Sequence, residues 1–193
     1  MNLTILEAGN MCLERIQDLT ESILIEKGDI TIPIDIIKLV TLDGFSVFSM
    51  PLQKIEGEDK TTGILMVNDN DNILKLDTNK VIILEESLEL KRRRFVTAHE
   101  YGHFKLHKKI ETSEFITKNT PRRNANTLTE DKSEIEADTF ARCILMPKIF
   151  VKNTIDPLYD SDKNKDTMIK IISEKFNVSL NKAEIRLQEL NYI

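Results

Sequence analysis

The sequence predicts an α+β fold, and three observations carry that prediction. Short β-branched and apolar runs, separated by Asn- and Asp-rich turns, occupy the middle of the chain. Apolar residues at helical spacing occupy both flanks. The length of 193 residues, with 40% hydrophobic and 31% charged residues, is typical of one folded domain. We therefore predict a single domain over residues 1–193, with a helical part at about 1–43, a sheet and a central helix at about 44–110, a loop and a helix at about 111–147, and a helical tail at about 148–193.

Two helices are expected in the N-terminal part. Residues 10–26 carry apolar side chains close to helical spacing. A second helix is predicted to begin at or near Pro33 and to continue through Val40, because proline is favoured in the first turn of a helix. Gly44 is expected to end it.

The middle of the chain predicts a small sheet. Residues 45–50 alternate between apolar and polar side chains, as a half-buried strand does. Three further short segments, 63–67, 72–76 and 80–84, are separated by turn-forming residues. Such short, closely spaced segments favour an antiparallel arrangement.

The second half is predicted to be mainly helical, apart from one polar stretch. Residues 111–132 show no sustained periodicity, so we predict a long loop or a weak hairpin, and long loops are often functional. The predicted helices cover residues 88–108, 133–146 (ending before Pro147), 165–176 and 180–190.

Charge and composition limit the cellular setting. The net charge is −5, and no apolar run approaches the length of a membrane helix. The start of the chain lacks the features of a secretory signal, and Cys12 and Cys143 do not form a metal-type pair. We therefore predict a cytoplasmic protein that binds neither membrane nor nucleic acid.

The two tail helices resemble a helix-turn-helix, but residues 165–193 hold five basic and four acidic residues, which is a weak basic face. Packing, or docking of a protein partner, is the preferred interpretation.

The three histidines of the chain all lie within residues 99–107. On a helix, His99 and His103 are about 40° apart around the axis and roughly 6 Å apart along it, so both can bind one cation. Glu100 follows the first of them and lies on the adjacent edge of that face. This is the HExxH pattern of zinc peptidases, in which the glutamate acts on water without binding the metal.

His107 is predicted to lie outside the metal's ligand set. It is eight residues from His99, or roughly 12 Å along the same helix. Two nitrogens on one zinc ion cannot be more than about 4 Å apart. A third ligand must therefore come from another segment.

Helical phase selects that ligand from the helix predicted at 133–146. At about 100° per residue, Glu134 lies roughly 20° and Asp138 roughly 60° from Ala141 on the apolar face. Glu136 lies about 140° away, toward solvent. We therefore predict Glu134 as the third ligand, with Asp138 hydrogen-bonded to the outer nitrogen of a histidine ligand.

The chain resembles the ImmA/IrrE family of metallopeptidases. The resemblance rests on the runs RRRFVTAHEYGHFKLH and EIEADTFARCILMP, and it extends to residues 33–51 and to the ending EKFNVSLNKAEIRLQELNYI. It implies a zincin-like core in which His99 and His103 bind zinc and Glu100 is the general base. Glu134 is similar to the glutamate ligand of related peptidases. Glu136 is the competing choice, because the Glu-Ala-Asp triplet is itself a recurrent feature of the family.

The resemblance also implies a function, namely cleavage of a helix-turn-helix repressor that controls phage, mobile-element or stress genes. Three protein ligands leave a fourth position for water, as in catalytic zinc sites. Zinc is the predicted ion, with manganese as the alternative. For stabilising the oxyanion, Tyr101, His107 and the arginines of the loop remain open. The rival hypothesis is a non-hydrolytic regulator that binds such a repressor through a zincin-like fold.

Overall fold

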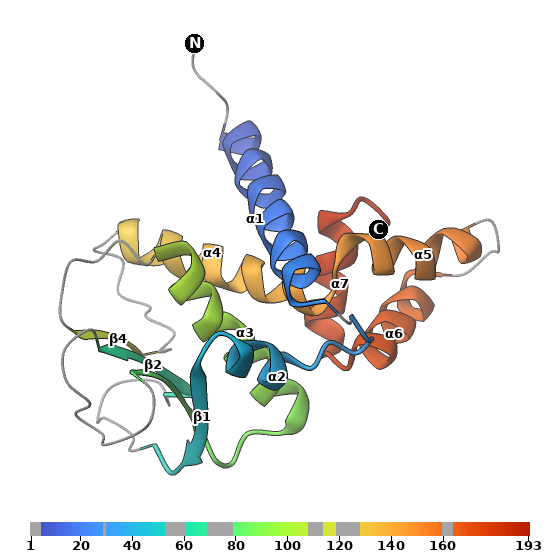
Figure 1. Cartoon of the computed structure of the whole chain (residues 1–193). Helices are drawn as coiled ribbons and strands as arrows, with labels where there is room; N and C mark the ends of the chain where they lie inside the picture. The colour runs from blue at the N-terminus through green and yellow to red at the C-terminus, as the bar shows by residue number, and fades with distance from the viewer. Residues whose placement is uncertain are drawn as a thin grey trace. The chain divides into compact units, whose positions relative to one another are not determined.

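The computed structural model describes residues 5–28, 30–52, 61–68, 79–107, 114–118, 128–159 and 164–193. Within these residues the chain forms seven helices and four strands, a mixed α+β architecture (Figure 1). Two compact units are present, one comprising residues 36–138 and the other residues 1–35 with 139–193. The prediction of a single domain stays a prediction. None of the described helices is both long enough and apolar enough to cross a bilayer.

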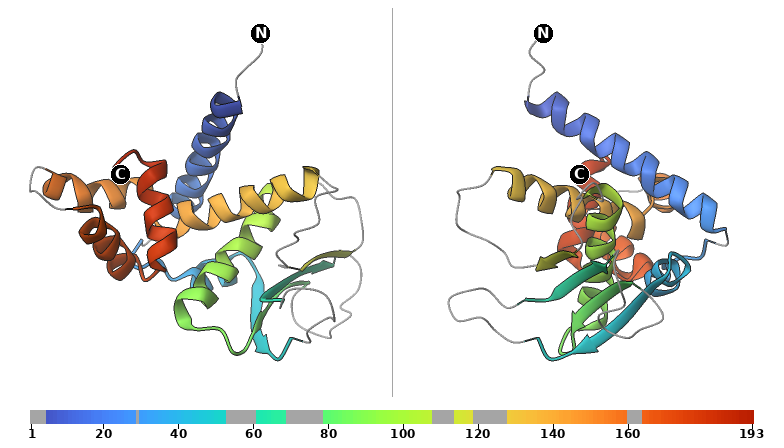
Figure 2. Two further views of the ribbon diagram at one scale, coloured as in Figure 1. Left: turned by 180° about the vertical axis from the view of Figure 1, so that it is seen from behind. Right: turned by 60° about the vertical axis from the view of Figure 1, so that its left-hand side comes forward.

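The sheet belongs to the unit formed by residues 36–138 (Figures 1 and 2). Its strands are β1 (Phe45–Met50), β2 (Gly63–Asn68), β3 (Lys80–Glu85) and β4 (Glu114–Lys118), in the order β1-β3-β2-β4. The first three lie within one residue of the predicted segments. The predicted segment 72–76 lies outside the described residues.

The prediction of an antiparallel sheet is wrong for one pair of strands. β2 runs antiparallel to β3 and to β4, but β1 runs parallel to β3, with Phe45 opposite Lys80. β1 pairs with β3 rather than with β2, the next strand along the chain, so no hairpin dictates its direction. β4 lies in the stretch predicted as a loop or weak hairpin.

Helix α3 (Leu90–His107) packs against β2, β3 and the short helix α2 (Ile36–Leu42). Every residue from Phe95 to Phe104 is buried, so this part of α3 is covered on all sides. α2 begins three residues after Pro33 and ends before Gly44, whose φ of +84° suits glycine. The HExxH segment therefore lies in the interior of its unit.

Helix α4 (Leu128–Leu145) begins five residues earlier than predicted and ends, as predicted, before Pro147. The boundary between the two units falls within it, after Asp138. Its predicted apolar face is fully buried, at Ala137, Phe140, Ala141, Ile144 and Leu145.

The other unit is helical, with α1 (Ile5–Lys27), the later residues of α4, α5 (Lys148–Tyr159), α6 (Lys165–Phe176) and α7 (Leu180–Glu189). The sequence analysis placed the residues of α5 in a helical tail but predicted no helix bounds there. The bounds of α6 match the prediction, and its end is set by Asn177, whose φ of 53° is left-handed. Ser179 then caps α7 by accepting a hydrogen bond from the Lys182 amide.

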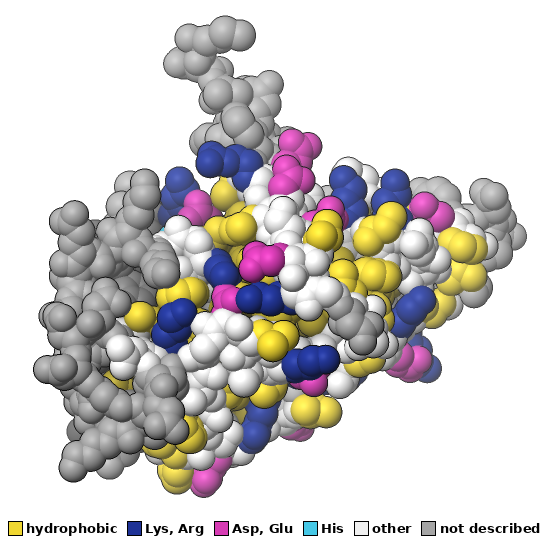
Figure 3. Space-filling view, viewed as in Figure 1, with side chains coloured by type: hydrophobic (Ala, Val, Ile, Leu, Met, Phe, Trp, Pro, Cys, Tyr) yellow, Lys and Arg dark blue, Asp and Glu magenta, His cyan; other side chains and the backbone are white. Residues whose placement is uncertain are grey.

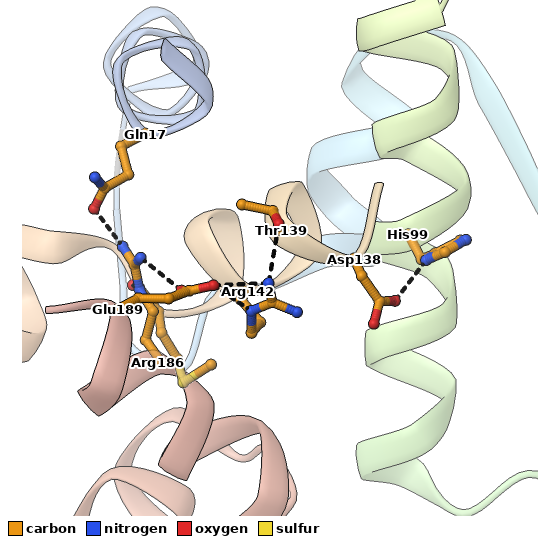
Figure 4. Close-up of polar contacts among 8 residues, drawn as sticks. Gln17, His99, Asp138, Thr139, Arg142, Arg186 and Glu189 are labelled. Atoms are coloured by element: carbon orange, nitrogen blue, oxygen red, sulfur yellow. Dashed lines mark hydrogen bonds and ion pairs between the residues drawn. The ribbon is translucent and has the colours of Figure 1, made fainter. Parts of the chain in front are cut away.

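A buried arginine connects the helices of this unit (Figure 4). Arg186 of α7 is fully buried and donates hydrogen bonds to the Met146 carbonyl and to Gln17 Oε1. It also pairs with Glu189, which in turn accepts a hydrogen bond from Arg142. A basic residue of the tail therefore serves packing. On the face of the molecule drawn in Figure 3, basic and acidic side chains lie interspersed.

Candidate metal centre

The two histidines of the HExxH segment face each other on α3. Their Nε2 atoms are 3.0 Å apart, and the ring centroids are 4.7 Å apart. Both residues are about 98% buried, with 2% relative exposure each. This arrangement follows from the helix, because residues four apart lie on one face.

Glu134 of α4 approaches both rings. Its Oε2 lies 3.2 Å from His99 Nε2, and its Oε1 lies 3.1 Å from His103 Nε2. Among the described residues, these three side chains form a group whose ligand atoms all lie within 4.8 Å of one another. The Glu134 side chain is partly exposed, whereas both histidines are buried.

Asp138, one turn beyond Glu134, holds the other edge of the His99 ring. Asp138 Oδ1 lies 2.9 Å from His99 Nδ1 (Figure 4). When Nδ1 carries the proton and donates it to this carboxylate, Nε2 is left to face Glu134 and His103. Residues at i and i+4 of α4 thus contact opposite nitrogens of one imidazole.

In the absence of a cation, a proton on His99 stabilises the group formed by His99, His103 and Glu134. Burial disfavours the charged form of His99, but hydrogen bonds with Asp138 and Glu134 outweigh it and raise the pKa to about 9. Burial likewise opposes ionisation of Glu134, yet its contacts with His103 and His99 lower the carboxyl pKa to about 2. At neutral pH a positive charge therefore occupies the space between the three side chains.

The residues present fit a divalent cation with nitrogen and oxygen ligands. Two imidazoles and one carboxylate are the ligand set of many catalytic zinc sites. Atoms 3.0–3.2 Å apart can all lie about 2.0–2.1 Å from one ion. The cation would then replace the proton that His99 holds.

Glu100 lies next to this group without belonging to it. It is fully buried on α3, and its negative charge helps to raise the pKa of His99. Its side chain packs against the start of β2, where Gly63 leaves space for it. The sequence analysis did not single out Gly63, because nothing in a local pattern reveals a contact between a strand and a distant helix.

Glu136 and His107 form a separate pair. Glu136 Oε2 lies 3.8 Å from His107 Nε2, and its Oε1 lies 3.7 Å from Lys132 Nζ. The phase argument placed Glu136 toward solvent, but its side chain is less exposed than that of Glu134 because it turns toward His107. Burial and the nearby His103 lower the pKa of His107. Neither residue belongs to the group that could hold the cation.

Tyr101, which the sequence analysis considered for stabilising the oxyanion, contacts another part of the unit. The residue is fully buried, and its hydroxyl donates a 2.7 Å hydrogen bond to Asp43 Oδ2. The same oxygen lies 2.5 Å from Lys105 Nζ. Tyr101 is therefore directed away from the histidines and is removed as a candidate for stabilising an oxyanion. The arginines of the predicted loop, Arg122 and Arg123, lie outside the described residues.

Two comparisons relate the chain to known proteins. The family described as the IrrE N-terminal-like domain, peptidase M78, matches residues 44–188. An uncharacterized immunity region protein 2 of Bacillus phage phi105 is 40% identical over 80 residues, which are 39% of this chain and 46% of that protein. The match thus spans less than half the length of the phage relative.

Proposed function

The chain belongs to the IrrE N-terminal-like family of metallopeptidases, and from that premise we propose that it is a zinc-dependent endopeptidase. The observation that carries this proposal is the convergence of His99, His103 and Glu134, from two helices, on one small volume. Asp138 beside His99 supports it, because histidine ligands usually donate their outer nitrogen to a carboxylate.

Each of these residues has a part in the proposed chemistry. His99, His103 and Glu134 would hold zinc, while Asp138 would fix the tautomer of His99. Zinc, when bound, supplies a Lewis acid that activates water and polarises a carbonyl. Glu100 would take a proton from the attacking water as general base and pass it to the leaving amine. Its burial on α3 keeps its carboxylate beside the ligands rather than in solvent.

We also propose the substrate class, a helix-turn-helix repressor in the cytoplasm. The family resemblance implies such a substrate. The phage relative carries the words "immunity region" in its name, a setting in which repressor cleavage would matter. The rival proposal is a regulator of the same fold that binds the repressor without cutting it.

One experiment separates these proposals. Purified protein is analysed for metal by plasma mass spectrometry and then incubated with candidate repressors from phages and mobile elements. We expect about one zinc per chain, and repressor fragments that are absent with Glu100→Gln although this variant retains zinc. Failure to bind zinc at neutral pH would overturn the peptidase proposal. Bound zinc with a stable repressor complex and no fragments would favour the regulator.

A further inference from the structure

Gly63 brings the first residue of β2 into unusually close contact with α3. The residue is buried and lies opposite Leu84 of β3 in the sheet. A Cβ atom built at this position would lie 2.5 Å from Val96 Cγ1, 2.8 Å from Glu100 Oε1 and 3.3 Å from Glu100 Cγ. The first two distances are shorter than real Cβ contacts.

The requirement for glycine here is steric and not conformational. Gly28 and Gly44 have φ values of +80° and +84°, which explain glycine at those positions, whereas Gly63 lies outside that region. Alanine would suit the backbone of Gly63. Alanine is excluded only because its methyl group would overlap Val96 and Glu100.

The two neighbours of Gly63 differ in how they can respond to a methyl group. Val96 is fully buried, and a β-branched side chain on a helix has one strongly preferred χ1 rotamer. Its Cγ1 therefore cannot turn away without cost. Glu100 has a longer side chain with more rotatable bonds, so its carboxylate is the group that would be displaced. Because the interior is close-packed, that displacement would also be transmitted to α3.

We propose that Gly63 is a positioning residue for Glu100, whose carboxylate occupies the space that a side chain at position 63 would fill. This inference rests on the proposed function, in which Glu100 is the general base. Gly63 is not among the residues that would hold the cation. Its role is to let β2 and α3 approach closely enough to fix the carboxylate beside His99.

The first test measures the contact without any substrate. Gly63→Ala is made in the native, Val96→Ala and Glu100→Ala backgrounds, and the midpoint of urea unfolding is measured for each. We expect the loss caused by Gly63→Ala to be smaller in both altered backgrounds. Losses that are equal in the native and Glu100→Ala backgrounds would show no coupling between positions 63 and 100, and would overturn the proposal.

The second test separates positioning from stability. Zinc affinity and the kinetics of cleavage are measured on the most rapidly cut member of a bacterial peptide library. We expect Gly63→Ala to lower kcat at least tenfold, with KM and zinc affinity within about twofold of native values. The double variant Gly63→Ala/Val96→Ala removes the overlap with Val96 but keeps the overlap with Glu100. We therefore expect it to regain stability without regaining kcat. Restored kcat would overturn the proposal and assign Gly63 to packing alone.

A destabilised variant elsewhere in the unit and the native protein itself provide the controls. Val40→Ala, in the buried face of α2, lowers stability within the same unit and should leave kcat within about twofold of native. A comparable kcat loss in Val40→Ala would attribute the Gly63→Ala effect to instability. If the native protein cuts neither the peptides nor the candidate repressors, the proposed function fails, while the unfolding data still decide whether Gly63 and Glu100 are coupled.

Discussion

Asp138 Oδ1 and His99 Nδ1 lie 2.9 Å apart, so the carboxylate of one helix fixes the ring orientation of a histidine on another. Glu134, on the same helix as Asp138, contacts the opposite nitrogen of that ring at 3.2 Å. α4 therefore holds the imidazole from both sides. In the proposed metal centre, α4 would supply one ligand and orient a second.

Removing the Asp138 charge should weaken zinc binding without abolishing it. Asp138→Asn retains the size of the side chain but loses the carboxylate that accepts the Nδ1 proton, and such partners are worth about 10–100-fold in metal affinity. Competition with a zinc-binding dye measures the affinity. Glu136→Gln, on the same helix, is the control. An Asp138→Asn affinity within twofold of native would contradict the assignment.

Glu134 and Glu136 should differ completely in their effect on metal content. Glu134→Ala removes the oxygens that lie 3.1–3.2 Å from both histidines, and the purified variant should contain less than a tenth of the native zinc. Glu136→Ala removes a contact to His107 and should retain about one zinc per chain. Plasma mass spectrometry of both variants decides between the two glutamates, and the opposite result would move the third ligand to Glu136.

The metal-free protein should have a narrow pH range of maximal stability. The pKa of His99 is raised from 6.5 to about 9, so its stabilising effect is complete below pH 6.5 and is lost as the pH rises through 9. The pKa of Glu134 is lowered from 4.5 to about 2, so its effect is complete above pH 4.5 and is lost as the pH falls through 2. These two groups favour maximal stability between pH 4.5 and 6.5.

Thermal unfolding in the presence of a chelator measures this profile. We expect the free energy of unfolding to fall on the order of 2 kcal/mol between pH 6.5 and 9.5. Glu134→Gln should remove the Glu134 contribution to the acid limb and reduce the alkaline limb, where Asp138 still raises the pKa of His99, and Glu136→Gln should leave both limbs unchanged. A native profile that is level from pH 6.5 to 9.5 would contradict the ion-paired arrangement.

Arg186 should be important for the stability of the helical unit. Arg186→Met leaves the Met146 carbonyl and Gln17 without their buried donor and leaves Glu189 with Arg142 alone, which we expect to cost about 3–5 kcal/mol. Urea unfolding measures the loss. Gln188→Ala changes an exposed neighbour on α7 and should cost less than about 0.5 kcal/mol. A loss below about 1 kcal/mol for Arg186→Met would contradict the packing role of the tail.

Cys143 should resist alkylation in the folded protein. Burial raises the pKa of its thiol to about 11, and only the thiolate reacts rapidly. Iodoacetamide at pH 8, followed by mass spectrometry of peptides, should show less than a tenth of Cys143 modified. The same treatment in concentrated urea should modify it fully. Rapid reaction of the folded protein at Cys143 would show that this part of α4 is not buried.

The elements that could be predicted from the sequence are those with a strong local signal. β1, β2, β3 and α6 carry clear periodicity, and their bounds agree with the structure to within one residue. β4 has only five residues in a polar stretch, and α5 contains Pro157, so local patterns did not predict either. The parallel pairing of β1 with β3 depends on contacts between distant segments. No local pattern specifies such a pairing.

In the candidate site too, the features set by local helix geometry could be predicted, and those set by packing between distant segments could not. The spacing of His99 and His103 and the phase of Glu134 depend on helix geometry, and the structure brings these three residues together. The turn of Glu136 toward His107 could not be predicted, because it needs the position of α3 relative to α4. Gly63 was missed for the same reason, since its importance lies in the packing of β2 on α3.

The hydrogen bond from Tyr101 to Asp43 is one of the contacts that limit the rotation of α3 about its own axis. Tyr101 lies midway between His99 and His103 in the sequence, so it projects from the opposite side of the helix. A contact to Asp43 on that side therefore restrains both imidazoles together. A rotation of about 10° would move a ring roughly 5–6 Å from the axis by about 1 Å, far more than a metal–ligand bond tolerates. The side of α3 that faces away from the two histidines thus contributes to their angular setting.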